Sequence, residues 1–412
     1  MSASTPWYRE GRLHYGVGIE DTFIPQERVG HRKLDEYELT QHYAHWREDL
    51  ALVAESGAEL LRWGVPWYLV EPRPGEFDWS WTDQVVEVMR ELGIRCVVDL
   101  MHYGTPLWLE NSFLNASYPE RVASYGRAVA ERYRDVWTDY TPLNEPHVNA
   151  EWCGQNGAWP PYLEGQDGFV KVIVQIARGM VRTQQEIAAV LPGATFVHVD
   201  AGFLFEGETS PLPRWLLEER RLLALDLITG RVDTGHALRG YLHQHGVTEA
   251  DLTWFRENAV QPDVVGLNYY PRFSTGRVVD GRHEPVRSDA AGLRTLVELY
   301  STRYGRPVAV TESSLVGTPE EKVEWLRLAT DELLALRSEG HDVVGFTWFP
   351  FFTLVDWLYR YDQKRPDEWF MEFGLVDLVR GADQDLARVR NDAFAVFREL
   401  ATDARAIGSS VS

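Results

Sequence analysis

The chain has 412 residues, of which 44% are hydrophobic and 25% charged, as is typical of folded globular proteins. Its 41 basic and 62 acidic residues give a formal net charge of −21. Nucleic acids and anionic membrane surfaces attract basic proteins, so a charge of this sign argues against both as partners.

Two cysteines, Cys96 and Cys153, are too few for a disulfide framework or a cysteine-rich zinc site. Cys96 lies in an apolar stretch, which predicts a reduced thiol in the core. The first residues show no apolar run of the signal-peptide kind, and no segment has the length and apolarity of a bilayer span. We therefore expect a cytoplasmic protein.

Short β-branched runs alternate with longer amphipathic stretches along the chain, which is the pattern of parallel βα units. The predicted strands cover residues 13–19, 59–63, 94–100, 136–141, 194–199, 262–267, 306–311 and 341–347. Eight such units predict a (β/α)₈ barrel. A doubly wound sheet is the alternative, but no Gly-x-Gly-x-x-Gly phosphate turn follows the first strand.

Helix predictions come from apolar residues that recur every three or four positions. This spacing is clear at Trp325, Leu326, Ala329, Leu333 and Leu336, and less regular at Ala387, Phe394 and Phe397. Long connections are expected at about 20–40, 268–288 and 348–382, where a barrel places its specificity loops. We expect one domain over residues 1–412, with a disordered tail after about residue 400.

Polar side chains follow nearly every predicted strand, at the end where a barrel carries its active site. In chain order they include Glu20, Asp21, Arg62, His102, Tyr103, Asn144, Glu145, Asn268, Tyr270, Glu312 and Trp348. Glu145 and Glu312 each follow an apolar run. Two carboxylates that converge on one pocket are the reacting groups of most glycosidases.

The same segments resemble, in order and at similar spacing, motifs of the family 1 glycoside hydrolases. The matches are Leu61–Trp67 (R-F-S-I-S-W), Met101–Pro106 (Y-H-W-D-L-P), Thr141–Pro146 (T-x-N-E-P), Gly266–Tyr270 (G-x-N-Y-Y), Thr311–Glu312 (T-E-N-G), Trp348–Trp357 (W-S-L-L-D-N-F-E-W, with one extra residue) and Phe373–Val376 (R-F-G-L-V).

This resemblance implies a retaining β-glycosidase without metal or organic cofactor, in which Glu145 is the general acid/base and Glu312 the nucleophile. Such an enzyme needs an ionised nucleophile and a protonated acid. Arg62 and Tyr270 would favour ionised Glu312, whereas burial and the charge of Glu312 would raise the pKa of Glu145.

The resemblance also implies a set of sugar contacts. Asn144 would bind the 2-hydroxyl, His102 another ring hydroxyl, and Trp348 would form the stacking floor. A first-strand glutamine of the family has no clear match, and Glu20 or Asp21 would take its place. The remaining expected substrate-binding residues are Asn268, Asp356 and Trp357.

Several positions depart from the family motifs. Ser313 and Ser314 replace an asparagine and a glycine, Tyr103 replaces a tryptophan, and Asp356 replaces a glutamate. Because the departures fall on residues that recognise a hexopyranose, we expect an unusual glycone, such as a deoxy- or amino-sugar, or a sugar on a small natural product.

Two alternatives stay open at this point. A transglycosidase would use the same intermediate with an acceptor in place of water. A catalytically silent sugar-binding barrel would keep the carboxylates without the reaction.

Overall fold

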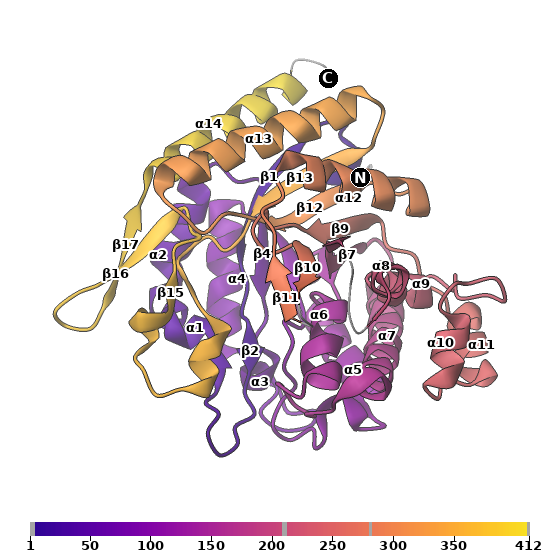
Figure 1. The fold of residues 1–412 in the computed structure, drawn as a ribbon. Coiled ribbons are helices and arrows are strands. Elements are labelled where there is room, and N and C mark those ends of the chain that lie inside the picture. Colours follow the sequence, from indigo (N-terminus) through magenta and orange to yellow (C-terminus); the bar gives the residue numbers. More distant parts are fainter. Residues whose placement is uncertain (1–4, 208–211, 280–281, 410–412) are drawn as a thin grey trace.

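The computed structural model describes residues 5–207, 212–279 and 282–409, and its centre is a closed barrel of eight parallel strands (Figure 1). Each strand pairs with the barrel strands before and after it in sequence, and the last pairs with the first. The barrel strands are β1 (His14–Ile19), β4 (Leu60–Gly64), β5 (Arg95–Asp99), β6 (Asp139–Thr141), β7 (Thr195–Ala201), β9 (Val264–Asn268), β12 (Val308–Ser313) and β13 (Val343–Trp348).

All eight predicted strands are confirmed, together with the (β/α)₈ barrel. The largest shift is at β6, which begins at Asp139 rather than residue 136. Val136 and Trp137 instead donate their backbone N–H groups to the carbonyl of Tyr133, so they form a turn after the preceding helix.

Side chains from the strands fill the interior of the barrel. Leu60, Val97, Val197, Val199, Val264, Ala309 and Val344 form one buried cluster with Trp7 and Tyr8. Trp7 belongs to the short helix η1 (Trp7–Arg9), and its indole N–H donates to Asp139 at 3.0 Å. The aromatic residues of η1 thus pack against the barrel core, whereas the polar strand-end residues lie at the carboxyl ends of the strands.

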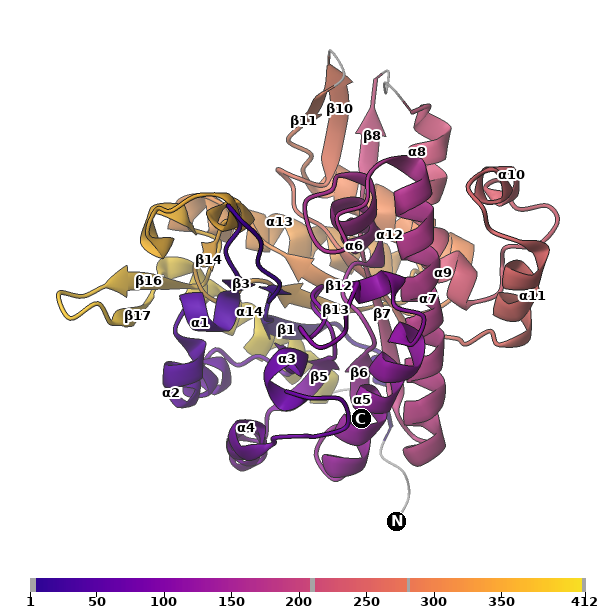
Figure 2. The same ribbon diagram turned by 90° about the horizontal axis from the view of Figure 1, so that it is seen from below.

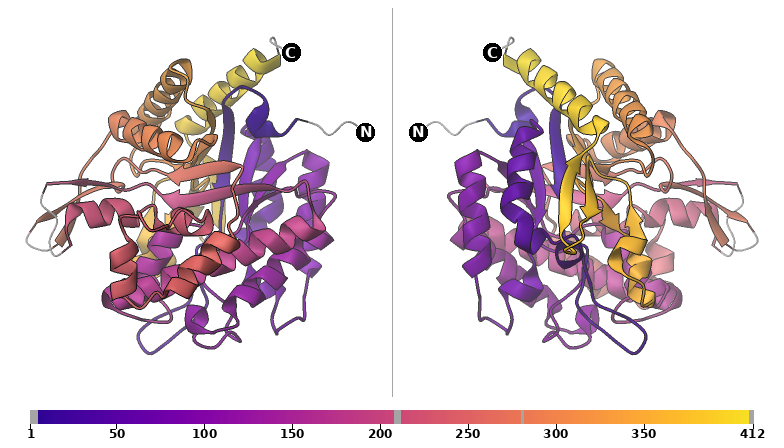
Figure 3. Two further views of the ribbon diagram at one scale, coloured as in Figure 1. Left: turned by 90° about the vertical axis from the view of Figure 1, so that its right-hand side faces the viewer. Right: turned by 90° about the vertical axis from the view of Figure 1, so that its left-hand side faces the viewer.

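Helices surround the barrel, and the outer helices α13 and α14 lie side by side (Figures 1 and 3). The longer helices are α2 (His42–Glu55), α4 (Ser80–Leu92), α5 (Tyr118–Arg132), α7 (Gly165–Val190), α11 (Glu249–Glu257), α12 (Ala290–Tyr304), α13 (Pro319–Ser338) and α14 (Asp392–Ser409). The shorter ones are α1 (Glu36–Leu39), α3 (Trp67–Val70), α6 (Pro146–Ala150), α8 (Arg214–Arg220), α9 (Leu223–Ile228) and α10 (Arg239–Gln244).

The structure confirms one predicted helix face and corrects two expectations near the C-terminus. All five apolar residues of the predicted face in α13 are buried. Helix α14 continues to Ser409, so the expected disorder after residue 400 is wrong up to that point, and residues 410–412 lie outside the described chain. Ala387 belongs to a strand, β17, rather than to the helix of Phe394 and Phe397.

The long connections carry small sheets and short helices. The sheet of β8 (Leu204–Glu206), β10 (Thr275–Val279) and β11 (Arg282–Pro285) projects from the barrel in Figure 2. The remaining strand pairs are β2 (Phe23–Ile24) with β3 (Leu34–Asp35), β14 (Leu354–Val355) with β15 (Phe370–Met371), and β16 (Val376–Arg380) with β17 (Leu386–Arg390). Short non-α helices are η2 (Ser112–Leu114), η3 (Glu151–Gln155), η4 (Trp357–Tyr361) and η5 (Pro366–Trp369).

Cys96 and Cys153 are free and buried, as predicted for Cys96. Among the described helices, none combines the length and apolar character needed to span a lipid bilayer.

Candidate active site

A cavity of about 440 Å³ lies at the carboxyl ends of the barrel strands and contains both predicted catalytic carboxylates. Its polar lining residues are His102, Tyr103, Glu145, Asn268, Tyr270, Ser274, Glu312 and Asp356. The other lining residues are Val148, Trp152, Ala201, Phe203, Phe273, Phe349, Pro350, Leu354, Trp357, Leu358, Met371 and Phe373. The lining is therefore largely apolar, with two carboxylates close to the barrel axis.

Local backbone irregularities set the positions of the two glutamates. Glu145 follows β6 and precedes α6 with a positive φ of 45°, a conformation that non-glycine residues rarely adopt. The pairing of β12 with β9 shifts register between Val310 and Glu312. Register shifts of this kind are common beside active sites, where they redirect a side chain.

Glu312 is almost fully buried and accepts charged and neutral hydrogen bonds. Nη1 of Arg62 lies 2.8 Å from its Oε1, and the hydroxyl of Tyr270 donates to its Oε2 at 2.6 Å. Both contacts stabilise the ionised carboxylate. The geometry predicted for Arg62 and Tyr270 is therefore present, and Glu312 is arranged as a nucleophile requires.

Glu145 has a different environment. Its Oε1 accepts a hydrogen bond from Nδ2 of Asn268 at 2.9 Å, and its Oε2 accepts one from the hydroxyl of Tyr103. Burial, followed by the negative charge of Glu312, raises the pKa of Glu145 to about 7. Glu145 can therefore hold a proton at near-neutral pH, as a general acid must.

Asn144 joins the two glutamates through Arg62 and Tyr103. Its Oδ1 accepts from Nη2 of Arg62 at 3.1 Å, and its Nδ2 donates to Nε2 of His102 and to the oxygen of Tyr103, both at 3.2 Å. His102 lines the cavity, but Asn144 is fully buried and does not. In this structure its amide is committed to neighbouring side chains, so the expected contact with a sugar 2-hydroxyl has no free donor.

The expectation for Trp348 is wrong. This side chain is completely buried, donates its indole N–H to the carbonyl of Phe373 at 3.1 Å, and does not line the cavity. The next residue, Phe349, does. Residues 348–357 exceed the nine-residue family motif by one, and starting the match at Phe349 removes the excess. Phe349 is therefore the aromatic residue at this position of the site.

Glu20 also lies outside the cavity. It is buried, lines a small inner cavity together with Phe349, and meets Nη1 of Arg62 at 2.9 Å, so its carboxylate pairs with a cation. Glu20, His102 and Glu312 are close enough to bind a metal ion together. The Arg62 guanidinium, however, forms ion pairs with both glutamates.

Asp356 and Trp357 both line the cavity, as expected. The carboxylate of Asp356 accepts the backbone N–H of Leu358 at 2.8 Å, so it also caps the helix η4. Trp357 packs edge-on against Tyr103, with ring centroids 5.5 Å apart.

Sequence reasoning missed the apolar walls formed by Phe203, Phe273, Leu354 and Met371. Phe273 and Met371 come from long connections outside every motif match, and Phe203 follows β7. Leu354 lies within the Trp348–Trp357 match but was not singled out there. Tyr103 was placed among the strand-end residues and recognised as a departure but was given no role, although its position beside His102 in the motif was the available signal.

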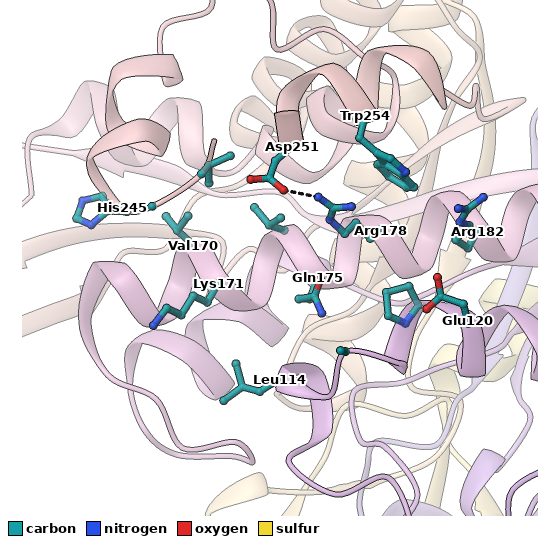
Figure 4. Close-up of a pocket in the computed structure, with 15 residues that line it drawn as sticks. Leu114, Glu120, Val170, Lys171, Gln175, Arg178, Arg182, His245, Asp251 and Trp254 are labelled. Atoms are coloured by element: carbon teal, nitrogen blue, oxygen red, sulfur yellow. Dashed lines mark hydrogen bonds and ion pairs between the residues drawn. The ribbon is translucent and has the colours of Figure 1, made fainter. Parts of the chain in front are cut away.

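A second cavity of about 440 Å³ lies on the outside of the barrel, against α5, α7 and α11 (Figure 4). Of its acidic lining residues, Asp251 pairs with Arg178 and Glu120 belongs to α5. Neither lies at the end of a barrel strand, so this cavity offers no equivalent of the Glu145 and Glu312 pair.

A closed (β/α)₈ barrel with two buried glutamates at its carboxyl end defines a barrel glycosidase. Comparisons with known proteins make this more specific. Residues 6–187 match the model of glycosyl hydrolase family 1. A bifunctional β-D-glucosidase/β-D-fucosidase of Bifidobacterium breve is 23% identical over 88% of this chain and 87% of its own. The 6-phospho-β-glucosidase AscB of Escherichia coli is 26% identical over 95% and 90%.

Solved structures agree on the fold. The family 1 β-glucosidase of Thermotoga maritima in complex with isofagomine lactam has a TM-score of 0.80 at 17% identity, covering 97% of this chain and 99% of that one. The N-terminal part of the chain thus resembles glycosyl hydrolase family 1, and most of its length is distantly similar to β-glucosidases.

Proposed function

We propose that the protein is a retaining β-glycosidase that hydrolyses a β-O-glycoside by double displacement, with Glu312 as the nucleophile and Glu145 as the acid/base. The observation that carries this proposal is the pair of unlike carboxylate environments in one cavity. Glu312 accepts from Arg62 and Tyr270, whereas burial raises the pKa of Glu145 to about 7.

In the first step, Glu312 attacks the anomeric carbon while Glu145 gives its proton to the leaving oxygen. The glycosyl ester that forms removes the negative charge of Glu312. Because that charge helps to raise the pKa of Glu145, the pKa falls and Glu145 becomes a base. It then takes a proton from water, which attacks the same carbon and releases the sugar.

We infer further that the glycone carries fewer polar contacts than an ordinary hexopyranose. The amide of Asn144 is committed to neighbours, Glu20 pairs with Arg62 and does not line the cavity, and Asp356 caps η4. A site that does not bind a hydroxyl has little to lose when that hydroxyl is missing. A deoxy-sugar fits this lining, and the relative from Bifidobacterium breve acts on β-D-fucosides, whose sugar lacks the 6-hydroxyl.

A phosphorylated glycone fits poorly. Several similar proteins are aryl-phospho-β-D-glucosidases or 6-phospho-β-glucosidases, and phosphate recognition generally uses arginine or lysine. Among the described residues that line this cavity there is neither.

The walls of the cavity indicate the rest of the substrate. Phe203, Phe273, Met371 and Phe373 present apolar surface, which favours an aromatic or aliphatic aglycone over a second sugar. A glycosylated small natural product combines this aglycone with the proposed glycone.

Labelling with 2-deoxy-2-fluoro-β-glycosides of glucose and fucose tests the function. Peptide mass spectrometry should find the sugar on Glu312, and an aryl β-glycoside screen should rank deoxy-sugars above glucose. Absence of labelling and turnover across the screen would favour the silent barrel instead. Products that appear only when an alcohol acceptor is added would indicate a transglycosidase.

A further inference from the structure

The hydrogen bonds around Asn144 have a fixed direction. Arg62 can only donate, so the atom of Asn144 that faces it must be the carbonyl oxygen. The amide nitrogen of Asn144 therefore donates to Nε2 of His102, and Nδ1 of His102 donates to Asp99 at 2.9 Å. These contacts fix the orientation of the amide and the tautomer of the imidazole.

Tyr103 continues this chain of donors to the acid/base. Its oxygen accepts from Nδ2 of Asn144 at 3.2 Å, so its single proton is free to be donated elsewhere. The acceptor is Oε2 of Glu145. The hydrogen bonds thus form a series from Arg62 through Asn144 and Tyr103 to Glu145. In each residue of the series, the hydrogen bond that it accepts fixes which atom donates the next one.

The placement of Tyr103 is tightly constrained. Its backbone has a positive φ of 89°, and its ring packs against His102, Trp159 and Trp357 at centroid distances of 4.6, 5.1 and 5.5 Å. A non-glycine residue keeps such a backbone conformation only where its surroundings impose it. The phenol is therefore held in position before any substrate arrives.

We propose that Tyr103 is a positioning residue for the acid/base: its hydroxyl holds Oε2 of Glu145 as an acceptor, while Asn268 donates to Oε1, and it stabilises the carboxylate left after proton transfer. This inference rests on the proposed function. It concerns a position at which the chain departs from the family motif, where a tryptophan is replaced by tyrosine.

The effect of Tyr103 on the pKa of Glu145 opposes the effects of burial and of the charge of Glu312. A donor to a carboxylate favours its charged form, so Tyr103 lowers a pKa that burial and Glu312 raise. The other titratable groups that face Glu145 are His102 after β5, Asp200 on β7, and Tyr270 after β9. Tyr103→Phe leaves all of these in place and removes the donor to Glu145, together with the oxygen that accepts from Asn144.

The test combines two measurements on the full-length protein. Titration of protein labelled with carboxyl-¹³C glutamate, followed by NMR, gives the pKa of Glu145 directly, with the signal assigned by its loss in Glu145→Gln. In Tyr103→Phe this pKa should rise by about 1, the effect of losing one hydrogen bond to a charged group. The alkaline limb of kcat/KM for a β-glycoside should move to higher pH by the same amount.

Tyr125→Phe is the matched control. Tyr125 is also a buried tyrosine, but its hydroxyl donates to the carbonyl of Val65 at 3.0 Å, and it does not line the cavity. Tyr125→Phe should leave the pKa of Glu145 and the alkaline limb of kcat/KM unchanged. An unchanged or lower pKa of Glu145 in Tyr103→Phe would overturn the inference.

The two proposals fail in different ways. A wild-type protein that neither hydrolyses nor becomes labelled refutes the function, whereas the NMR titration still decides the role of Tyr103. If Tyr103→Phe does not fold, wild-type protein labelled with ¹³Cζ-tyrosine replaces it. The ¹³Cζ chemical shift of Tyr103 should then change at the pH at which Glu145 titrates. A chemical shift that stays constant through that pH would contradict the inference.

Discussion

The floor and the walls of the cavity differ in composition and in origin. The floor and the residues that support it are polar and come from strands or strand ends: Glu312 lines the cavity, and Arg62, which does not, bonds to both Glu312 and Asn144. The walls are largely apolar, and residues such as Phe273 and Met371 come from the long connections. The floor matches the family motifs while much of the wall does not. Chemistry and substrate choice therefore reside in separable parts of the chain, because loops can vary while the barrel stays fixed.

Loss of the nucleophile should have the largest effect. Glu312→Gln keeps the size of the side chain but removes its nucleophilic charge, and we expect kcat/KM to fall by about 10⁴-fold or more. Initial rates with aryl β-glycosides measure this. Glu71→Gln is the matched control, because Glu71 is buried, bonds to the indole of Trp67, and does not line the cavity. Comparable loss in both variants would contradict the role of Glu312.

Loss of the acid/base should depend on the leaving group. In Glu145→Ala, kcat/KM for alkyl glycosides should fall by about 10²–10⁴-fold, since the departing alkoxide needs a proton. Glycosides of acidic phenols should lose much less. A series of leaving groups of increasing pKa gives this dependence as a slope, and a uniform loss across the series would exclude Glu145 as the proton donor.

The pH dependence of kcat/KM tests the protonation of Glu145, and the expected effect is smaller. The reaction needs protonated Glu145, and its pKa is raised to about 7, so kcat/KM should decline as pH increases through about 7. Glu145→Ala should lose this alkaline limb with activated aryl glycosides. If the decline of kcat/KM at alkaline pH persists in Glu145→Ala, the group that titrates there is not Glu145.

A change in the wall should have the smallest effect. Asp356→Glu restores the residue of the family motif and extends the carboxylate by one methylene group. We expect kcat/KM for β-glucosides to rise about fivefold, equivalent to about one additional hydrogen bond, with little change for deoxy-glycosides. Asp383→Glu, in the turn between β16 and β17, is the control. Equal gains on both substrates would show that Asp356 does not select the glycone.

The sequence predicted the barrel because each strand is a short buried run, and it predicted the floor because polar residues follow those runs in recognisable order. Glu145, Glu312, Arg62 and Tyr270 lie together for this reason. The error at Trp348 arose because aromatic residues occupy two consecutive positions, and only the backbone decides which one faces the cavity. The walls could not be predicted, because contacts between loops depend on tertiary packing rather than on local pattern.

The positive φ of Glu145 has a consequence for how this protein balances durability against turnover. A side chain in that region is disfavoured by about 1–2 kcal/mol relative to glycine. Glu145→Gly should relieve this backbone strain, while it loses the hydrogen bonds from Tyr103 and Asn268 and the proposed proton donor. The carboxylate proposed as the acid/base is therefore held in a disfavoured backbone conformation, and stability and reactivity conflict at this residue.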